Sequence, residues 1–252
     1  MTTVPKRRAT VVRGVSAGLG FVAGVGSAVR VIGGRTGFWA ALVALACAAS
    51  AVGQAGGAGG VREDFEKAEV GPLPESLMII DGGWVVAEAE TGGKVLELQS
   101  EPVVDGVVLV GPSMKEAAVV SAKIKAGKSR RAHPRMGVGL YGVSGVKCRL
   151  VPARKTLELV NGEEEVVGEV AFAEWKEDVW WQFELRVNAA GDGWVVEARV
   201  WPAGDDRPAA PQLSKPLADG PGTGRASVLG TPFANKPVYF DEVVVGTTIG
   251  AP

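Results

Sequence analysis

Hydrophobic and polar residues alternate most regularly between Trp180 and Trp201. In the first half of this stretch every second residue is apolar: Trp181, Phe183, Leu185 and Val187. In the second half one side collects Trp194, Val196, Ala198 and Val200. Asn188, Gly191 and Gly193 lie in the connection between the halves, and such residues tolerate the positive φ that a tight connection needs. The pattern predicts an antiparallel hairpin with one buried face.

The alternation also predicts which side chains of the hairpin are inside. We expect the core to receive Trp181, Phe183, Leu185, Trp194, Val196 and Val200. The opposite face should carry Trp180, Glu197, Arg199 and Trp201, because burying an unpaired charge costs more than exposing an indole. Glu184 and Glu197 should form cross-strand ion pairs with Arg186 and Arg199.

Short strand-like runs continue on both sides of this hairpin, separated by Gly, Pro, Asn and Asp, and no segment sustains a helical period beyond two turns. Many short strands with turn signals between them indicate an all-β, antiparallel two-sheet jelly-roll sandwich. The runs are 84–89, 95–99, 107–110, 117–126, 136–141, 146–151, 156–160, 165–170, 225–230 and 238–246.

An uninterrupted apolar run, Phe38–Ala49, follows Arg35 and precedes small residues at Ala51 and Ala55. This order is typical of a secretory signal peptide, and it predicts an exported protein that is periplasmic, on the cell surface or extracellular. The run is shorter than the ~20 residues of a comfortable membrane span. Membrane contact is therefore expected only through an uncleaved leader or one lipidated at Cys47.

The leader sets the domain organisation that we expect for the whole chain. Residues 1–55 are an N-terminal extension and signal peptide, and 56–61 are a Gly/Ala linker. The folded domain covers 62–247, and 248–252 form a C-terminal tail.

The charge of the mature part excludes one class of partner. Six of the 27 basic residues lie in 1–55, which has no acidic residue, so the remainder carries 21 basic residues against 28 acidic ones. A net-acidic domain of this kind is not expected to bind nucleic acid. Cys148 alternates with Lys147 and Arg149, so it should point inward as a small buried hydrophobic residue.

Several segments resemble the strands of concanavalin A-like jelly rolls: 136–145, 151–159, 198–204 and 238–245. The similarity is greatest to laminin-G-like and 3-keto-disaccharide-hydrolase-like modules of secreted planctomycete-type proteins, and it covers about residues 62–247. It implies a concanavalin A-like jelly-roll fold, whereas the matching segments are weakly specific for any activity. In such jelly rolls a carboxylate on the last strand often helps to bind a structural Ca²⁺, which implies a metal role for Asp241, with Asp64 and Glu66 near the other chain end. Alternatively, Asp241 is a surface residue that caps a loop.

The polar residues give little support for catalysis. Glycoside hydrolases on this fold carry a strand with acid and nucleophile ~5 Å apart, and no such carboxylate pattern exists here. Glu163–Glu165 comes nearest, but it follows Asn161-Gly162 and reads as a solvated turn. His133 is the only histidine, which excludes a histidine pair for a metal and makes a Ser-His-Asp set unexpected. We therefore predict no catalytic residue.

The outward tryptophans of the hairpin are the strongest candidates for ligand binding. An indole supplies a flat apolar platform for a sugar ring, so we predict carbohydrate binding by Trp180, Trp201, Arg199 and Glu197. A covering loop is the alternative for both indoles. The basic run from Lys123 to Arg135 could hold an anionic glycan or form a charged, solvated loop.

Three functions stay open at this point. The first is a secreted, non-catalytic module that binds a glycan or a cell-surface polymer. The second is a glycoside-cleaving enzyme of the 3-keto-disaccharide hydrolase type, and the third is a purely structural assembly domain.

Overall fold

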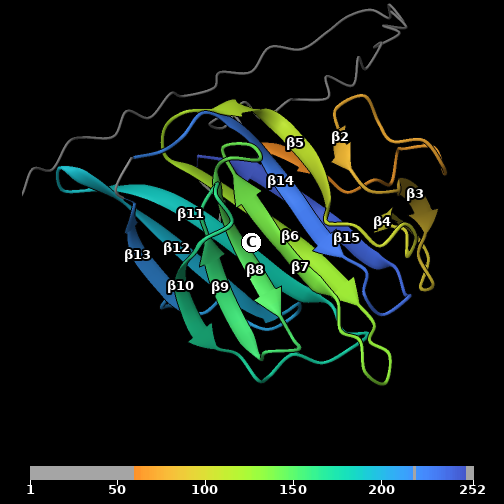
Figure 1. Cartoon of the computed structure of the whole chain (residues 1–252). Helices are drawn as coiled ribbons and strands as arrows, with labels where there is room; N and C mark the ends of the chain where they lie inside the picture. Colours follow the sequence, from red (N-terminus) through yellow and green to blue (C-terminus); the bar gives the residue numbers. More distant parts are fainter. Residues whose placement is uncertain (1–59, 218–219, 248–252) are drawn as a thin grey trace, which may run out of the picture. The chain divides into compact units, whose positions relative to one another are not determined.

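The structure, a computed structural model, describes residues 60–217 and 220–247. Within these ranges it consists of β-strands and connecting turns and loops, without a helix. Two antiparallel sheets stack face to face, and their inner faces enclose one hydrophobic core (Figure 1). The all-β, two-sheet sandwich predicted from the alternation is confirmed.

The first sheet has the strand order β13-β12-β11-β6-β15-β4-β3, and β1 pairs with β15 outside this path. All pairs in it are antiparallel. Its strands are β1 (Val61–Glu63), β3 (Trp84–Glu88), β4 (Lys94–Leu98), β6 (Ala118–Ala126), β11 (Trp181–Ala190), β12 (Gly193–Pro202), β13 (Leu213–Leu217) and β15 (Val238–Gly246).

The second sheet has the order β10-β9-β8-β7-β14-β5-β2 and is also antiparallel throughout. Its strands are β2 (Met78–Asp81), β5 (Gly106–Met114), β7 (Arg135–Leu140), β8 (Val146–Val151), β9 (Thr156–Val160), β10 (Val166–Ala171) and β14 (Gly224–Thr231). In Figure 1 the arrows β7, β8 and β9 lie in front of the first sheet.

The predicted hairpin is formed by β11 and β12, with Trp181 opposite Pro202 and Ala190 opposite Gly193. The strands extend further than the alternation indicates, so that only Gly191 and Asp192 connect them, and Gly191 takes a φ of 60°. Five of the six residues predicted to be inside are buried: Trp181, Phe183, Leu185, Val196 and Val200. The sixth, Trp194, is half-buried and packs against the core. The predicted register is therefore confirmed.

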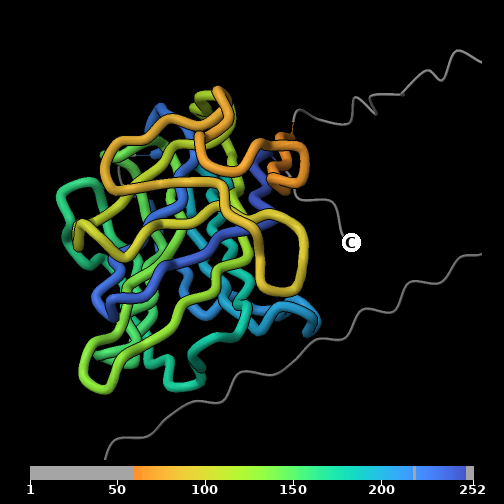
Figure 2. Tube along the Cα trace, turned by 90° about the vertical axis from the view of Figure 1, so that its right-hand side faces the viewer, coloured from red at the N-terminus to blue at the C-terminus, as the bar shows by residue number. Residues whose placement is uncertain are grey.

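Sequence-distant strands are neighbours on both sides of the hairpin. β11 pairs with β6, which begins 63 residues earlier, and β6 pairs in turn with the last strand, β15. The two ends of the described part meet as well, because β1 pairs with β15 from Val61↔Val245 to Glu63↔Val243. Figure 2 shows the described start of the chain, in orange, beside the blue C-terminal strand.

Cys148 points into this core and is fully buried, as predicted. Burial raises the pKa of its thiol to about 12, so the thiolate is not populated near neutral pH. In the part of the chain that the structure describes, no helix has the length and apolar character needed to span a membrane. The predicted signal peptide and linker, and the tail from residue 248, lie outside the described residues.

Candidate functional site

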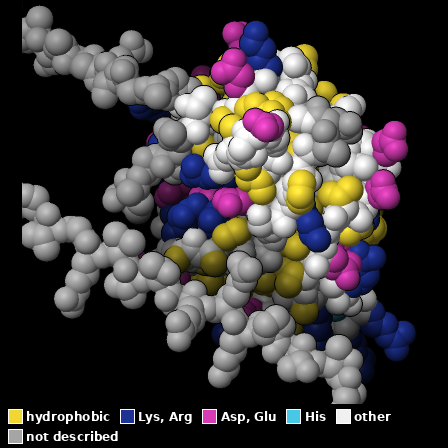
Figure 3. Space-filling view, turned by 90° about the vertical axis from the view of Figure 1, so that its left-hand side faces the viewer, with side chains coloured by type: hydrophobic (Ala, Val, Ile, Leu, Met, Phe, Trp, Pro, Cys, Tyr) yellow, Lys and Arg dark blue, Asp and Glu magenta, His cyan; other side chains and the backbone are white. Residues whose placement is uncertain are grey.

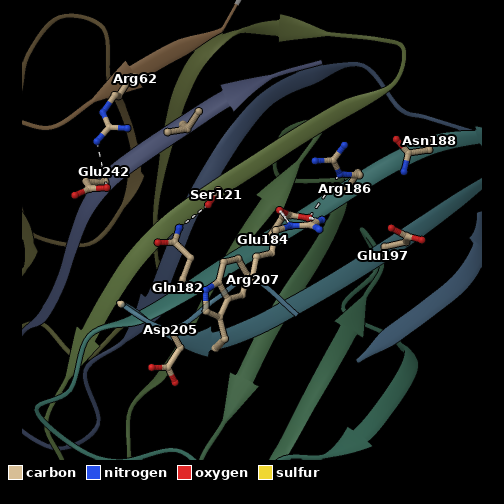
Figure 4. A pocket seen from close by; sticks show the side chains of 13 residues that line it. Arg62, Ser121, Gln182, Glu184, Arg186, Asn188, Glu197, Asp205, Arg207 and Glu242 are labelled. Carbon is tan, nitrogen blue, oxygen red and sulfur yellow. Dashed lines mark hydrogen bonds and ion pairs between the residues drawn. The ribbon is translucent and has the colours of Figure 1, made fainter. Parts of the chain in front are cut away.

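The first sheet carries a pocket on its outer face, which is the face turned away from the second sheet. β11 places every second side chain there, because its remaining residues point into the core. The pocket, which we call the sheet pocket, has a volume of about 760 Å³ (Figure 4). Acidic and basic side chains stand next to one another on one side of the molecule in the space-filling view (Figure 3). The sheet pocket is lined by Arg62, Ser121, Gln182, Glu184, Arg186, Asn188, Glu197, Trp201, Gly204, Asp205, Arg207, Glu242 and Val244.

A buried carboxylate, that of Glu184, lies at the centre of the sheet pocket, and its side chain is only 2% exposed. Arg207 donates two hydrogen bonds to it, from Nε to Oε2 at 2.7 Å and from Nη2 to Oε1 at 2.5 Å. Arg199, directly opposite on β12, donates from Nη1 to Oε1 at 3.2 Å. A bidentate guanidinium contact of this kind is among the stronger side-chain interactions in proteins.

These arginines decide the ionisation of Glu184. Burial alone would raise the pKa of this carboxyl, because removal from water disfavours the charged form. The hydrogen bond from Arg207 and the charges of Arg207, Arg186 and Arg199 outweigh burial, and the pKa of Glu184 is lowered below its ordinary value. Glu184 is therefore a carboxylate at neutral pH.

Arg207 reaches Glu184 because the loop after β12 folds back over the sheet. Gly204 has a φ of 107°, a conformation that glycine adopts without strain, and the N–H of Asp205 donates to the carbonyl of Pro202 at 3.1 Å. The loop returns at Gln212, whose side chain accepts from the N–H of Val200 at 3.1 Å and donates to its carbonyl at 2.7 Å. Both ends of the loop are thus fixed to the end of β12.

The opposite wall of the sheet pocket comes from β6, β15 and β1. The Gln182 side chain donates to the hydroxyl of Ser121 on the neighbouring strand β6 at 2.5 Å. A bulge in β15 follows Asp241, and Glu242 adopts a positive φ of 45° there. The Glu242 carboxylate then pairs with Arg62 at 3.2 Å and with Lys123 at 2.5 Å.

The structure separates the four residues predicted to bind carbohydrate. Trp201 and Glu197 line the sheet pocket. Arg199 does not line it and is 5% exposed, because it donates to Glu184 and to Glu197. Trp180 precedes β11 and lies outside the lining, where the ammonium of Lys125 is 5.3 Å from the centroid of its ring.

Cross-strand ion pairing on the hairpin is confirmed, with one difference from the expectation. Glu184 pairs with Arg199 directly across the strands. Glu197 lies directly opposite Arg186, but it accepts its hydrogen bond from Arg199 on its own strand, at 3.2 Å. Glu184 and Arg199 are both buried, although they lie on the outer face of the first sheet.

Each of the three residues predicted to hold Ca²⁺ accepts a hydrogen bond from a backbone N–H. Asp64 Oδ1 accepts the N–H of Glu66 at 3.3 Å, Glu66 Oε1 accepts the N–H of Lys94 at 3.1 Å, and Asp241 Oδ1 accepts the N–H of Glu242 at 2.6 Å. Within residues 60–217 and 220–247, no group of three or more His, Cys, Asp or Glu side chains is arranged to hold a metal ion. Ca²⁺ binding therefore stays a prediction, and the described residues contain no cluster of acidic side chains that would support it.

Sequence reasoning missed most of the sheet pocket. Gln182 and Glu184 could have been found, because the alternation places them on the same face as Trp201 once that strand is assigned. Arg207 follows no periodic pattern, since it lies in a loop. Arg62 and Ser121 come from strands whose pairing partners are more than 50 residues away, and local patterns do not reveal such partners.

No family model matches the sequence, and a search of curated proteins finds no match. Solved structures do resemble it. A Bacillus subtilis protein of unknown function with a galectin-like fold is 10% identical, with 76% of this chain and 100% of that chain covered and a TM-score of 0.50. A variant of the GH43 protein BlXynB from Bacillus licheniformis is 12% identical, with 73% of this chain and 39% of that chain covered and a TM-score of 0.51. The carbohydrate-binding module CBM66 of Bacillus subtilis is 14% identical, with coverages of 68% and 95% and a TM-score of 0.45.

These similarities concern the fold. The resemblance to concanavalin A-like jelly rolls is confirmed at the level of the fold, which is similar to that of the Bacillus subtilis protein with a galectin-like fold.

Proposed function

We propose that this domain is an exported, non-catalytic carbohydrate-binding module and that the sugar lies in the sheet pocket. One observation carries the proposal. Trp201, an aromatic platform, lines a pocket of about 760 Å³ together with many side chains that can form hydrogen bonds. Sugar rings combine apolar C–H faces with hydroxyl groups at their edges, and an aromatic platform with polar neighbours matches both features.

Several polar side chains that line the sheet pocket have free hydrogen-bonding capacity. Asn188 and the carboxylate of Asp205 make no side-chain hydrogen bond to any residue in the described ranges, although both line the sheet pocket. Gln182 uses one donor on Ser121 and keeps its carbonyl oxygen. A ligand that brings hydroxyl groups would satisfy these donors and acceptors.

The state of Glu184 supports binding rather than hydrolysis. A glycosidase needs a carboxylic acid that holds its proton near the working pH, and such an acid has a raised pKa. Glu184 is the most buried carboxyl of the sheet pocket, but its arginine neighbours lower its pKa and occupy both of its oxygens. It acts in this proposal as the anchor that holds Arg207 over the pocket.

The first prediction concerns Trp201. A glycan array on the purified protein identifies a bound oligosaccharide, and isothermal titration then compares variants. Trp201→Ala should weaken binding about tenfold, equivalent to ~1.4 kcal/mol, because the ring loses its stacking platform. Phe233→Ala is the matched control: this phenylalanine is 42% exposed, does not line the sheet pocket and should bind as the wild type does.

Two outcomes would contradict the proposal: no glycan binds, or Trp201→Ala binds as tightly as the wild type. Trp180→Ala maps the extent of the site, because Trp180 lies on the same face beside Lys125 but outside the pocket lining. A loss in that variant as well would extend the site along the sheet, as the sequence predicts. Release of a sugar from a 3-keto glycoside would favour the enzymatic alternative.

A structural assembly role is the second candidate because one edge of the second sheet is exposed and apolar. β2 ends that sheet, and Met78, Ile79 and Ile80 are about half exposed there. Exposed apolar edge strands can pair with another chain. Concentration-dependent self-association in the absence of glycan binding would favour this candidate.

A further inference from the structure

A row of large side chains crosses the outer face of the first sheet next to the sheet pocket. Trp180, Lys125 and Tyr239 point outward, because the residues on either side of Lys125 and Tyr239, and the residue after Trp180, are buried in the core. Tyr239 lies opposite Lys125 on β6 and opposite Glu97 on β4. Trp180 comes directly before the first paired residue of β11 and lies beside Lys125. These side chains therefore form one line across neighbouring strands.

Lys125 holds the two aromatic rings in place. Its Nζ lies 5.3 Å from the ring centroid of Trp180 and 5.1 Å from that of Tyr239, within the range of cation–π contacts. The same nitrogen lies 3.7 Å from a carboxylate oxygen of Glu90, and the lysine side chain is only 16% exposed. All three side chains of this aromatic row (Trp180, Lys125 and Tyr239) are half-buried, so a ligand that binds them has little side-chain freedom left to remove.

Groups that can form hydrogen bonds lie at the edge of the aromatic row. Burial raises the pKa of Glu97, next to Tyr239, and no hydrogen bond or neighbouring charge of a described residue offsets the rise. The pKa of the Tyr239 hydroxyl is raised as well, chiefly by burial, and no hydrogen bond contributes. The hydroxyl groups of a sugar would supply partners for both side chains.

The aromatic row continues the platform that Trp201 provides in the sheet pocket. Trp201 lies opposite Gln182, and Gln182 is two residues from Trp180 along β11. Strands are about 4.8 Å apart and two residues of a strand span about 7 Å, so the backbone of Trp180 lies about 8 Å from that of Trp201. Tyr239 lies two strands further, about 16 Å from Trp201. One sugar ring cannot contact both ends of this path, whereas a chain of several rings can.

The charges along this path favour a neutral ligand. The lining of the sheet pocket contains three cations, Arg62, Arg186 and Arg207, and four carboxylates, Glu184, Glu197, Asp205 and Glu242. Each of the three guanidinium groups lies 3.6 Å or less from a carboxylate oxygen. The lining therefore offers an anionic sugar no unpaired cation, and its excess of carboxylates would repel such a sugar.

We infer that the aromatic row is a second sugar-binding platform and that the first sheet binds a neutral, linear oligosaccharide across its strands, from Trp201 to Tyr239. The inference rests on the proposed carbohydrate-binding function and adds the ligand class to it. One ring of the chain stacks on Trp201, and later rings stack on Trp180 and Tyr239. The aromatic faces pack against the apolar C–H faces of the sugar, while hydroxyl groups at the ring edges meet Gln182 and Glu97.

The length of the glycan provides the test. A glycan array on the purified protein first shows whether glycans bind. Isothermal titration then compares cellohexaose, laminarihexaose and mannohexaose, which are neutral and linear, with the disaccharide of each series and with oligogalacturonate. At least one hexasaccharide should bind about tenfold more tightly than its disaccharide, because only the longer chain reaches the aromatic row. Oligogalacturonate should bind more weakly than this hexasaccharide, and high salt should reduce the difference.

Tyr239→Ala separates the aromatic row from the sheet pocket. It should lower the affinity for the hexasaccharide about tenfold and leave the affinity for the disaccharide, which lies on Trp201, unchanged. The unchanged disaccharide affinity distinguishes loss of a contact from unfolding. Tyr239→Phe keeps the ring and should retain most of the hexasaccharide affinity.

Trp180→Ala makes the same distinction at a position that precedes β11, and it serves as the second variant if Tyr239→Ala does not fold. It should also lower only the hexasaccharide affinity. Phe233→Ala is the matched control, because this exposed phenylalanine belongs neither to the aromatic row nor to the lining of the sheet pocket. Both affinities should stay at the wild-type value in that variant.

The possible failures are distinct. Equal affinity for hexasaccharide and disaccharide, with loss of both in Trp201→Ala, overturns the inference and leaves the proposed function standing. Array binding to branched or acidic glycans only has the same consequence, as does wild-type hexasaccharide affinity in both Tyr239→Ala and Trp180→Ala. Absence of binding to every glycan overturns the proposed function itself.

Discussion

Two adjacent tryptophans, Trp180 just before β11 and Trp181 at its first position, lie on opposite sides of the first sheet. Trp181 is 2% exposed, contacts Phe172 edge-on at a centroid distance of 5.6 Å and donates its indole N–H to the carbonyl of Lys176 at 3.2 Å. Trp180 is half-buried on the outer face against Lys125. One step along the strand therefore changes a core residue into a surface residue.

Trp181→Ala should lower the free energy of unfolding by about 3–5 kcal/mol, as expected for truncating a large aromatic side chain in a core. Trp180→Ala should cost no more than about 1 kcal/mol, because it mainly loses a cation–π contact. Urea unfolding, followed by fluorescence and circular dichroism, measures both values. A larger loss in Trp180→Ala than in Trp181→Ala would show that the register of β11 is shifted by one residue.

At the scale of elements, the strands that alternate strictly could be predicted and the others could not. The sequence placed β8, β9 and β15 at their observed bounds and nine further strands, including β11 and β12, within a few residues. It missed β1, β2 and β13. β13 contains Pro216, which is tolerated because β13 is an edge strand that pairs only with β12, while β2 has three consecutive apolar residues and all four of its residues are exposed.

Two glycines of β7 lie where a side chain would collide with neighbouring strands. Gly137 and Gly139 match a dinucleotide-binding pattern by spacing, but they lie within a strand and relieve crowding against neighbouring groups. A Cβ atom at Gly137 would lie 2.0 Å from the carbonyl oxygen of Cys148 on β8, and backbone cannot move aside as a flexible side chain does.

Gly137→Ala should therefore destabilise the domain by about 1–3 kcal/mol, the usual cost of overpacking. Gly193→Ala is the control, because a Cβ there would have its nearest neighbour at 3.9 Å and its φ is not positive. That variant should be neutral or slightly stabilising. Thermal unfolding of the two variants gives the comparison, and equal melting temperatures would contradict the close approach of β7 and β8.

At the scale of the whole molecule, the sheet pocket is a product of topology. Its walls come from β1, β6, β11, β12, β15 and the loop after β12, which are far apart in the sequence. Trp201 and Glu197 could be predicted because the hairpin is local. Arg186 was expected to form an ion pair, and its Nε lies 3.6 Å from Glu184 Oε1, an oxygen that also accepts a hydrogen bond from Arg207 in the loop.

The stability of the whole domain should depend on Glu184 under acidic conditions. Burial alone would raise the pKa of this carboxyl, but Arg207, Arg186 and Arg199 lower it below the ordinary value of 4.5. The unfolded chain therefore binds the proton at a higher pH than the folded domain does. The stabilisation is complete above the unfolded pKa and is lost as the pH falls through the folded pKa.

Glu184→Gln removes this titration, so its free energy of unfolding should fall less steeply than that of the wild type below about pH 4.5. The variant should also be less stable at neutral pH, because Arg199 and Arg207 lose their carboxylate partner. Asp241, whose pKa is raised chiefly by burial, titrates with the opposite effect in both proteins and cancels in the comparison. Urea unfolding at a series of pH values measures the two slopes. Parallel curves for wild type and variant would mean that the arginines do not hold Glu184 ionised, and the proposed anchor for Arg207 over the sheet pocket would be wrong.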